Sequence, residues 1–508
     1  MRKNRIEREI DKANDIDFDY KEISDKINFD KYSESAREKK KRGVKKRSFI
    51  AVMSGAMAAV IALSIALPIA FNAKNVIEKN TAETPVYNGT DAVAPIGEHD
   101  AAFDAVGAPS RADGFYGETV DKTAEVGNGR ERIPAGLITA SEWDDNGNYQ
   151  YFLSLFSEKV EQIEPDENGQ QADIGEVVRG KFQDYLEKDR WGFYANDRVI
   201  VRVTDEDGAP VVGAKVAYYN GEQNTVCAVS DALGTAYIFP ESESGSFIVK
   251  SGDNEVIGSY SAEERDVTVT LSDAAEKDNI IKLMFVVDVT GSMGDELRYL
   301  TAEVQDVISR VASANDGVRI DLALLFYRDD GDIEKFAYHD FVTVTDNDQG
   351  LSEVLANMKK QSAEGGGDYP EALDEALEIA AEKDWGSENS TKIIFHLYDA
   401  PPHEEQVNKS RYASAVMLAA EKGIRINPVL CSGADLLCEY LARECAIHTQ
   451  GRFVFVTDDS GIGGSHHDPE IPDAVVEALN DLLVRLVNGF HSGVFAEPVK
   501  WQAPQEEQ

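Results

Sequence analysis

The chain has 508 residues, which is enough for two to four domains. Its formal net charge of −41 argues against nucleic acid as a partner, because a polyanion would be repelled. Four cysteines are too few for a disulfide scaffold in a chain of this length.

The N-terminal region indicates a membrane anchor. Residues 1–48 contain 16 Lys and Arg against 11 Asp and Glu, and are typical of a cytosolic tail. Residues 49–71 contain no charge and are long enough to span a bilayer. The basic run 39–47 precedes them, so we expect a single-pass protein of the cell membrane with a cytoplasmic N-terminus and the remaining domains outside. A cleaved signal peptide is the alternative interpretation.

Two segments of less regular composition follow. Residues 72–130 are rich in Ala, Gly, Asp and Thr with scattered Pro, which favours an extracellular linker. Residues 131–195 contain aromatic side chains at high density, notably Trp143 and the stretch 149–156. Aromatic groups need a surface to pack on, so we expect this segment to dock on a neighbouring domain.

Residues 196–272 are predicted to form a small all-β sandwich. Short apolar runs alternate with turn signals, and strands are expected at 199–203, 215–219, 235–239, 247–250 and 267–271. The turn from Asp207 to Ala214 and the run from Ser230 to Gly234 resemble those of carboxypeptidase-regulatory and bacterial Ig-like modules. The resemblance implies a spacer.

Strand and helix patterns alternate in residues 278–490, before a C-terminal tail, 491–508. Strands are expected at 282–288, 319–326, 392–398, 425–430 and 452–456. Helices are expected at 294–313, 351–361, 370–383, 409–423, 433–447 and 471–488. This alternation predicts an α/β fold with a doubly wound, mostly parallel sheet.

Polar side chains follow the first of these strands. Asp288, Thr290 and Ser292 come directly after the apolar run 283–287. In open α/β sheets, ligands bind at the carboxyl ends of strands. A carboxylate with two hydroxyls suits Mg²⁺ or a similar hard cation.

Two later loops add acidic residues to this pattern. Gly365–Gly367 precede Asp368, Pro370 and Glu371, and Asp399 follows the strand predicted at 392–398. With the first loop, these motifs make residues 281–488 resemble a von Willebrand factor A domain, and Asp288-x-Thr290-x-Ser292 its metal-ion-dependent adhesion site.

The resemblance implies a ligand set for one divalent cation, Mg²⁺ or else Mn²⁺ or Ca²⁺. Asp288, Thr290 and Ser292 would form the first loop of the site, and Asp399 the third, through water. The second loop departs from the commonest pattern, which has Thr there. Its Asp-x-Pro-Glu spacing is similar to the integrin β-subunit version, which favours Glu371 over Asp368 as ligand. Extra cation sites at Asp295, Glu296 and Asp329 are conceivable.

Several of these residues have a simpler interpretation. Asp288 could cap the following helix, and Glu371 could only favour a helix N-terminus. His403 is interpreted as a loop-packing residue, and Ser465–Asp468 as a surface loop. Cys431, Cys438 and Cys445 are expected to be buried as small apolar residues, with a Cys431–Cys438 bridge as the alternative.

These features predict a cell-surface binding or adhesion protein, of a kind typical of bacteria. A cation held by hydroxyls and few carboxylates keeps positive character, so an acidic side chain of a protein ligand could complete its shell. A transmembrane sensor that relays ligand binding through the cytosolic tail is the alternative. No catalytic motif is recognisable, so we do not expect an enzyme.

Overall fold

The computed structural model of the protein describes residues 138–161, 176–187, 191–220, 224–272, 274–344, 348–387, 389–460, 467, 469, 471–472 and 474–502. All of them belong to one compact unit of the chain, Thr84–Gln508. The predicted tail, membrane span and linker, residues 1–130, lie outside the described residues. Among the helices that are described, none combines the length and the apolar character needed to cross a membrane.

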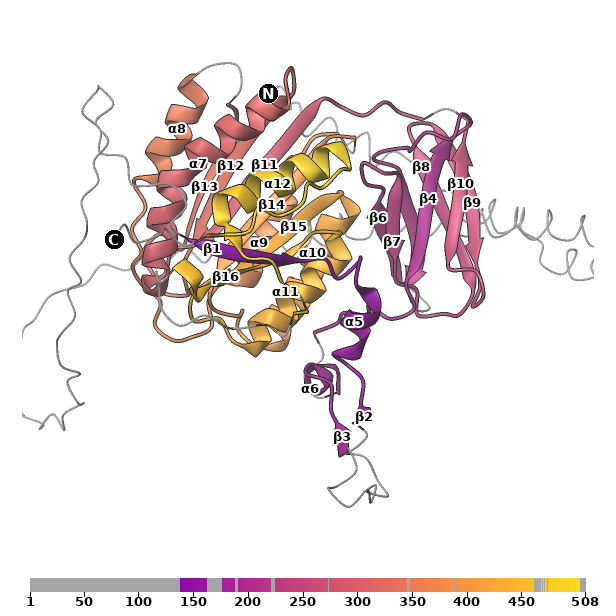
Figure 1. Ribbon diagram of the computed structural model, residues 1–508, viewed down its shortest axis with the longest axis horizontal. Helices are drawn as coiled ribbons and strands as arrows, with labels where there is room; N and C mark the ends of the chain where they lie inside the picture. The colour runs from indigo at the N-terminus through magenta and orange to yellow at the C-terminus, as the bar shows by residue number, and fades with distance from the viewer. Residues whose placement is uncertain are drawn as a thin grey trace, which may run out of the picture. The chain divides into compact units, whose positions relative to one another are not determined.

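A large sheet forms the centre of an α/β domain (Figure 1). Its strand order is β13-β12-β11-β14-β15-β16-β1-β17. The strands are β1 (Thr139–Trp143), β11 (Ile280–Asp288), β12 (Arg319–Tyr327), β13 (Phe336–Thr343), β14 (Thr391–Tyr398), β15 (Ile424–Leu430), β16 (Phe453–Thr457) and β17 (Glu477–Ala478). From β12 to β16 all neighbours run parallel, whereas β13 and β1 are antiparallel to theirs. The prediction of a mostly parallel sheet is therefore confirmed.

Helices cover both faces of this sheet. The helices are α7 (Gly294–Ala314), α8 (Asp348–Met358) and α12 (Leu479–Ser492) on one face, with α9 (Leu373–Glu382), α10 (Gln406–Glu421) and α11 (Leu436–Thr449) on the other. Successive residues of β11 point to opposite faces, so Phe285 packs with Leu300 of α7 while Val286 joins the cluster around α9. The apolar strands of the sequence are thus buried on both sides.

Strand β1 comes from the segment that precedes the β-sandwich. It pairs with β16 over its whole length, from Thr139 opposite Thr457 to Trp143 opposite Phe453. The side chains of residues 139–141 are buried, and Ala140 belongs to the same apolar cluster as Phe285. The segment expected to dock therefore supplies a strand of the sheet, and the β-sandwich is inserted in the chain between β1 and β11.

Buried ion pairs hold this segment against the domain. Arg443 of α11 and Asp145 are both fully buried, with Nη2 and Oδ1 2.5 Å apart. Arg485 of α12 pairs with Glu477 of β17 and, at 3.0 Å, with Glu142 of β1. Each arginine therefore meets a carboxylate from a distant part of the sequence, which offsets the cost of burying both charges.

The inserted β-sandwich consists of two sheets with one shared core. The first has the order β10-β4-β7 and the second β6-β5-β8-β9. The strands are β4 (Val199–Asp205), β5 (Lys215–Asn220), β6 (Asn224–Val229), β7 (Thr235–Ile238), β8 (Gly245–Ser251), β9 (Asn254–Tyr260) and β10 (Asp266–Leu271). Val201 of the first sheet and Phe247 of the second are fully buried in this core. The resemblance to a specific module family stays a prediction.

Short elements connect β1 to the β-sandwich. They are α5 (Tyr149–Ser154), β2 (Lys159–Glu161), β3 (Glu176–Val178) and α6 (Gln183–Glu187). Phe156 and Phe182 both pack against Tyr440 of α11, with ring centroids 6.2 and 5.5 Å away. The aromatic density seen in the sequence thus serves contacts with the α/β domain.

Candidate functional site

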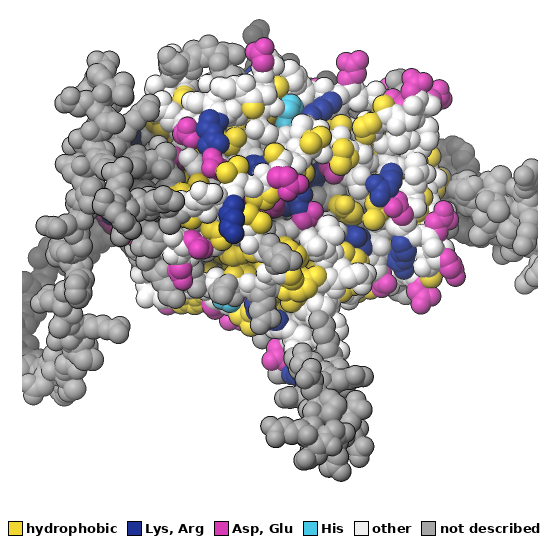
Figure 2. All heavy atoms as spheres, in the orientation of Figure 1, with side chains coloured by type: hydrophobic (Ala, Val, Ile, Leu, Met, Phe, Trp, Pro, Cys, Tyr) yellow, Lys and Arg dark blue, Asp and Glu magenta, His cyan; other side chains and the backbone are white. Residues whose placement is uncertain are grey.

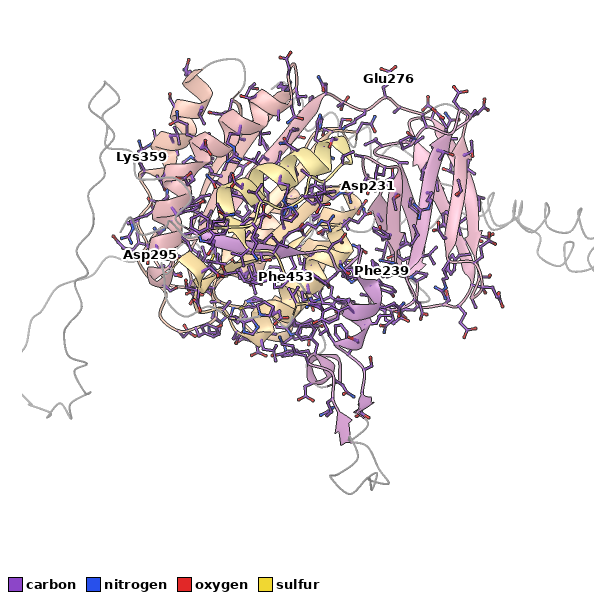
Figure 3. All side chains as sticks on the ribbon, in the orientation of Figure 1. Asp231, Phe239, Glu276, Asp295, Lys359 and Phe453 are labelled. Carbon is purple, nitrogen blue, oxygen red and sulfur yellow. The ribbon has the colours of Figure 1, made fainter. Side chains whose placement is uncertain are left out.

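The predicted first and third loops lie at the same edge of the sheet. β11 ends at Asp288, and Asp399 follows the end of β14. These two strands are parallel neighbours, with Val287 opposite Leu397. The start of α7, where Figure 3 labels Asp295, follows directly from the first loop. The loops therefore meet at the carboxyl ends of the strands, where α/β sheets bind ligands.

Hydrogen bonds fix the conformation of the first loop. Oδ1 of Asp288 accepts from the backbone N–H of Thr290 at 2.8 Å and from its hydroxyl at 2.7 Å. A short 3-10 helix, Gly291–Met293, then leads into α7. The residue that caps α7 is Met293, without a side-chain hydrogen bond. Asp288 thus orients Thr290 rather than capping the helix.

The third loop lies close to Ser292 of the first loop. Burial raises the pKa of the Asp399 carboxyl, which is 4% exposed, and the Ser292 side chain opposes this shift. The backbone carbonyl of Asp399 accepts from the Tyr369 hydroxyl at 3.4 Å. Ser292 and Asp399, both predicted to serve one cation, are therefore close enough for Ser292 to affect the pKa of Asp399.

The second loop brings Glu371 to the site and leaves Asp368 at the surface. Glu371 is 4% exposed, and its backbone N–H donates to the carbonyl of Pro401 at 3.0 Å. Gly366 has φ of +75°, and a Cβ there would lie 2.8 Å from Oε1 of Glu371 and 3.2 Å from Cβ of Thr290. The glycine thus permits Glu371 and Thr290 to approach each other, whereas Asp368 is exposed.

The three buried carboxylates each keep one oxygen without a partner. Within the described part of the chain, Oδ2 of Asp288, Oε2 of Glu371 and Oδ1 of Asp399 are buried and make no hydrogen bond. Such groups are costly in a protein interior unless something compensates them. They come from three different loops, those that contain Asp288, Glu371 and Asp399.

The pKa values of these carboxyl groups reflect the same deficit of positive charge. Burial raises the pKa of Asp288 to about 7, although its hydrogen bonds to Thr290 oppose the shift. Burial and then the charges of Asp288, Asp329 and Asp399 raise the pKa of Glu371 to about 9. Burial also raises the pKa of Asp399. A cation would stabilise the charged forms of these groups.

A second pair of polar residues borders the site. His403 Nε2 lies 2.8 Å from Oδ1 of Asp329, which is 3% exposed. Oδ2 of Asp332 accepts from the N–H groups of Asp329 at 3.2 Å and Gly366 at 2.9 Å. His403 therefore does more than pack in a loop, because it joins the third loop to the residues that follow β12.

The chemistry of the predicted set fits a hard cation. Its carboxylate and hydroxyl oxygens are the ligand types preferred by Mg²⁺, Mn²⁺ and Ca²⁺. Among the residues that are described, His, Cys, Asp and Glu side chains form no group of three or more arranged to hold a metal ion by themselves. The predicted set depends in addition on the hydroxyls of Thr290 and Ser292.

The other candidate residues have structural partners. Asp295 pairs with Arg298 on α7, and Glu296 accepts from the hydroxyl of Ser432 at 2.7 Å. His467 lies 2.6 Å from Glu439 of α11. The remaining residues of the 465–468 stretch lie outside the described part.

The cysteines are free thiols. Cys431, Cys438 and Cys445 are buried, as expected for small apolar residues. The structure does not contain the alternative Cys431–Cys438 bridge. Cys438 and Cys445 both lie on α11 within the apolar cluster that includes Tyr398.

Comparison with known families places this site in a known context. Residues 282–450 match the family model described as von Willebrand factor A domain. The chain contains a von Willebrand factor A domain. The resemblance to this kind of domain is thereby confirmed for residues 282–450, whereas the metal-ion-dependent adhesion site stays a prediction, and the α/β domain is called the A domain below. Strand β1 and helix α12 lie outside the matched residues but complete its sheet and one of its helical layers.

Individual relatives match over limited stretches. An ariadne-like RING finger protein of Acanthamoeba polyphaga mimivirus is 28% identical over 141 residues, 27% of this chain. The match spans only 13% of that protein's length. The crystal structure of the conserved hypothetical protein BatB from Bacteroides thetaiotaomicron has 16% identity and a TM-score of 0.25, and the match covers 36% of this chain and 91% of that one. An aerotolerance-related membrane protein from Bacteroides fragilis has 13% identity and a TM-score of 0.27, with 41% and 98% covered.

Two residues that shape the site, Asp332 and Tyr369, were not predicted from the sequence. Asp332 anchors the glycine loop through Gly366, and Tyr369 bonds to the carbonyl of Asp399. Asp332 belongs to the acidic run 329–332 after a predicted strand, so its position at a strand end was a usable signal. Tyr369 had no comparable signal, because its role depends on the path of a loop.

Proposed function

We propose that the A domain captures an acidic side chain of a protein partner through one divalent cation. The observation that supports this most strongly is the set of unpaired carboxylate oxygens on Asp288, Glu371 and Asp399. A cation bound there would supply the positive charge that these groups lack and an open position for a partner's carboxylate. The net charge of −41 would otherwise repel an acidic partner.

Each loop has a separate task in this proposal. Asp288, Thr290 and Ser292 present one carboxylate and two hydroxyls, with the Thr290 hydroxyl held by Asp288, and Asp399 adds a carboxylate close to Ser292. Glu371 is the favoured ligand of the second loop, because it is buried beside Thr290 while Asp368 is exposed. Mg²⁺ is the favoured ion, with Mn²⁺ or Ca²⁺ as alternatives.

We further propose that the protein acts at the cell surface. The uncharged stretch 49–71 would anchor the chain in the membrane, with the basic run 39–47 on the cytoplasmic side. Residues 72–130 and the β-sandwich would then hold the A domain away from the bilayer. This arrangement makes binding or adhesion a more natural function than catalysis.

Capture experiments with the full chain test the proposal. Surface proteins should be retained by the wild type in Mg²⁺ and released by EDTA, and the Asp288→Asn variant should retain none. Asp306→Asn is a matched control, because Asp306 is a half-exposed acid of α7 that pairs with Arg310. Capture that persists in EDTA and in Asp288→Asn would exclude the metal-dependent mechanism.

A further pair of variants distinguishes the two acids of the second loop. Glu371→Gln should abolish capture, whereas Asp368→Asn should leave it largely unchanged. The reverse result would assign the ligand role to the exposed aspartate.

A further inference from the structure

Three of the large apolar side chains exposed by the described residues lie around the candidate metal site. Ile333 is 90% exposed, Val407 61% and Tyr369 45%. Ile333 follows the end of β12, Tyr369 lies in the second loop, and Val407 lies in the first turn of α10, which follows β14. All three segments are therefore at the carboxyl ends of the strands, the same edge of the sheet as the metal site.

Contacts of the second loop place Ile333 and Tyr369 beside the site. Oδ2 of Asp332, the residue before Ile333, accepts from the N–H of Gly366 at 2.9 Å. The Tyr369 hydroxyl donates to the carbonyl of Asp399 at 3.4 Å, so this side chain extends from the second loop to the third. One of the two apolar residues is thus next to a residue that contacts the glycine loop, and the other belongs to that loop.

The start of α10 also adjoins the second loop. Asn408, the residue after Val407, donates from Nδ2 to Oδ2 of Asp374 at 3.2 Å. Asp374 belongs to the first turn of α9, three residues after Glu371. Val407 thus lies on the same side of the metal site as the other two apolar residues, beside the loop that contains Glu371.

The position of these three residues matters more than their exposure. Scattered apolar side chains are normal at a protein surface, and the face drawn in Figure 2 carries them among charged groups. Around the second loop, in contrast, apolar residues from three separate segments converge. The start of α7, which borders the first loop, presents the ion pair of Asp295 and Arg298 instead. Apolar surface therefore borders the metal site on the side of Glu371.

The apolar residues are accompanied by negative charge. Glu334 and Glu405 lie within two positions of them in the sequence, and both are exposed. Lys335 and Arg411, two basic residues of the same region, both pair with Glu375, at 3.0 and 3.1 Å. The surface thus offers apolar area together with exposed carboxylates. A partner segment with apolar and basic side chains is complementary to it, whereas a purely acidic segment would be repelled.

We propose that this surface binds a protein segment in which the acid that reaches the cation is flanked by large apolar and basic side chains. The inference rests on the proposed metal-dependent capture and adds the composition of the partner around its acid. The apolar flanks pack on Ile333, Tyr369 and Val407, and the basic flanks pair with Glu334 and Glu405.

Panning of a peptide display library on the full chain tests this composition. The library carries short peptides with Asp or Glu fixed in the middle and any amino acid at the other positions. Binding in Mg²⁺ and elution with EDTA should enrich peptides that have both a large apolar residue and Lys or Arg beside the fixed acid. Failure to enrich any peptide, or enrichment of peptides without these flanks, would overturn the proposal.

A synthetic form of an enriched peptide then locates the binding surface. Ile333→Ser and Val407→Ser together should weaken its binding at least about tenfold, because each removes apolar contact area. Val494→Ser is the control, since this side chain is 72% exposed and follows α12. The last turn of α12 contacts Thr391 at the start of β14, which is the opposite edge of the sheet. Unchanged affinity in the double variant, or an equal loss in Val494→Ser, would contradict the location.

Titration with Mn²⁺ separates this inference from the proposed function. The double variant should bind Mn²⁺ as the wild type does, because neither residue is a proposed ligand. Glu334→Gln with Glu405→Gln should also keep the ion and weaken the peptide about threefold, as expected for exposed ion pairs. If Mn²⁺ binds but no peptide with these flanks is enriched, the composition of the partner is wrong while the metal site stands. If the chain binds no Mn²⁺, both proposals fail.

Discussion

Asp288 and Asp145 are both buried carboxylates, 0% and 1% exposed, but their surroundings differ. Asp145 meets the fully buried Arg443, with two nitrogen–oxygen contacts of 2.5 and 3.1 Å. Among the described residues, Asp288 has only Thr290 as a hydrogen-bond donor, and it shares its surroundings with Asp329 and Asp399. One carboxylate is neutralised within the protein, whereas the other lies in a cluster of like charge.

Asp145 illustrates a buried charge that is paired within the fold, and Asp288 a buried charge that is not. The paired acids of the β1 segment hold distant parts of the chain together, and truncating one partner leaves the other charge buried and uncompensated. The unpaired acids at the carboxyl ends of the strands lower the stability of the metal-free protein. If a cation binds there, its binding free energy would offset the cost of burying these carboxylates.

The largest expected change in the free energy of unfolding comes from breaking the buried Arg443–Asp145 pair. Arg443→Met should lower the free energy of unfolding by about 3–5 kcal/mol, because Asp145 is left buried without its cation. Chemical denaturation measures the change. The control is Arg310→Met, in which a 40% exposed side chain loses its ion pairs, at a cost of about 0–1 kcal/mol. Equal losses in the two variants would mean that burial does not strengthen the Arg443 pair.

The unpaired carboxyl group of Glu371 should make the free energy of unfolding fall as the pH rises, whereas ordinary surface acids do not. The pKa of Glu371 is raised from 4.5 to about 9 in the folded protein, which therefore holds a proton that the unfolded chain releases. The resulting stability is present below pH 4.5 and is lost as the pH rises toward 9. In EDTA, denaturation at several pH values should show this loss in the wild type and a reduced slope in Glu371→Gln. If the free energy of unfolding changed with pH equally in the wild type and in Glu371→Gln, Glu371 would not be the group responsible.

A smaller effect is expected from the glycine beside Glu371. Gly366→Ala should cost about 1–2 kcal/mol, because a side chain is strained at a φ of +75° and would crowd Glu371. Gly208→Ala is the matched control, since its φ is +84° but no atom lies within 4 Å of the added Cβ. Both variants should lose stability, while Mn²⁺ affinity should fall only in Gly366→Ala. A fall in both would point to a global effect.

The smallest effect concerns the junction between the domains. Lys215 of the β-sandwich and Glu421 of α10 are 3.0 Å apart, with side chains 34% and 46% exposed. Glu421→Gln should therefore change the free energy of unfolding by less than about 1 kcal/mol. Denaturation of this variant checks the value, and a larger loss would show that the ion pair contributes more to the junction than its exposure suggests.

The central sheet was predictable because its strands are long apolar runs with acidic residues at their ends. The expected strand 282–288 corresponds to Ile280–Asp288, and the helix expected at 294–313 to Gly294–Ala314. Strand β13 was not predicted, because an edge strand with half-buried residues lacks that apolar pattern. Helix α12 begins at Leu479 rather than 471, since the residues just before it pair as β17.

The role of β1 could not be read from its sequence. The segment 139–143 is short and of mixed polarity. Its partner strand β16 lies more than three hundred positions later in the chain. Only the assembled fold brings Asp145 to Arg443. For the same reason, a fragment limited to residues 278–490 would lack a strand of the sheet and would be a poor tool for binding studies.

The candidate site was predictable in outline. The acids after two parallel strands had to lie at one edge of the sheet, which brings together the loops of Asp288 and Asp399. Whether Asp368 or Glu371 faces that edge depends on the path of the glycine loop, which spacing alone does not define. The structure places Glu371 inside and Asp368 at the surface.

Titration of the full chain with Mn²⁺, followed by electron paramagnetic resonance of the free ion, tests the central claim most directly. We predict that the wild type binds Mn²⁺ at a site for which Mg²⁺ competes. Asp288→Asn should lose this site and Asp306→Asn should retain it. Equal Mn²⁺ binding by the wild type and Asp288→Asn, or no binding by either, would contradict the claim that the unpaired carboxylates form a metal site.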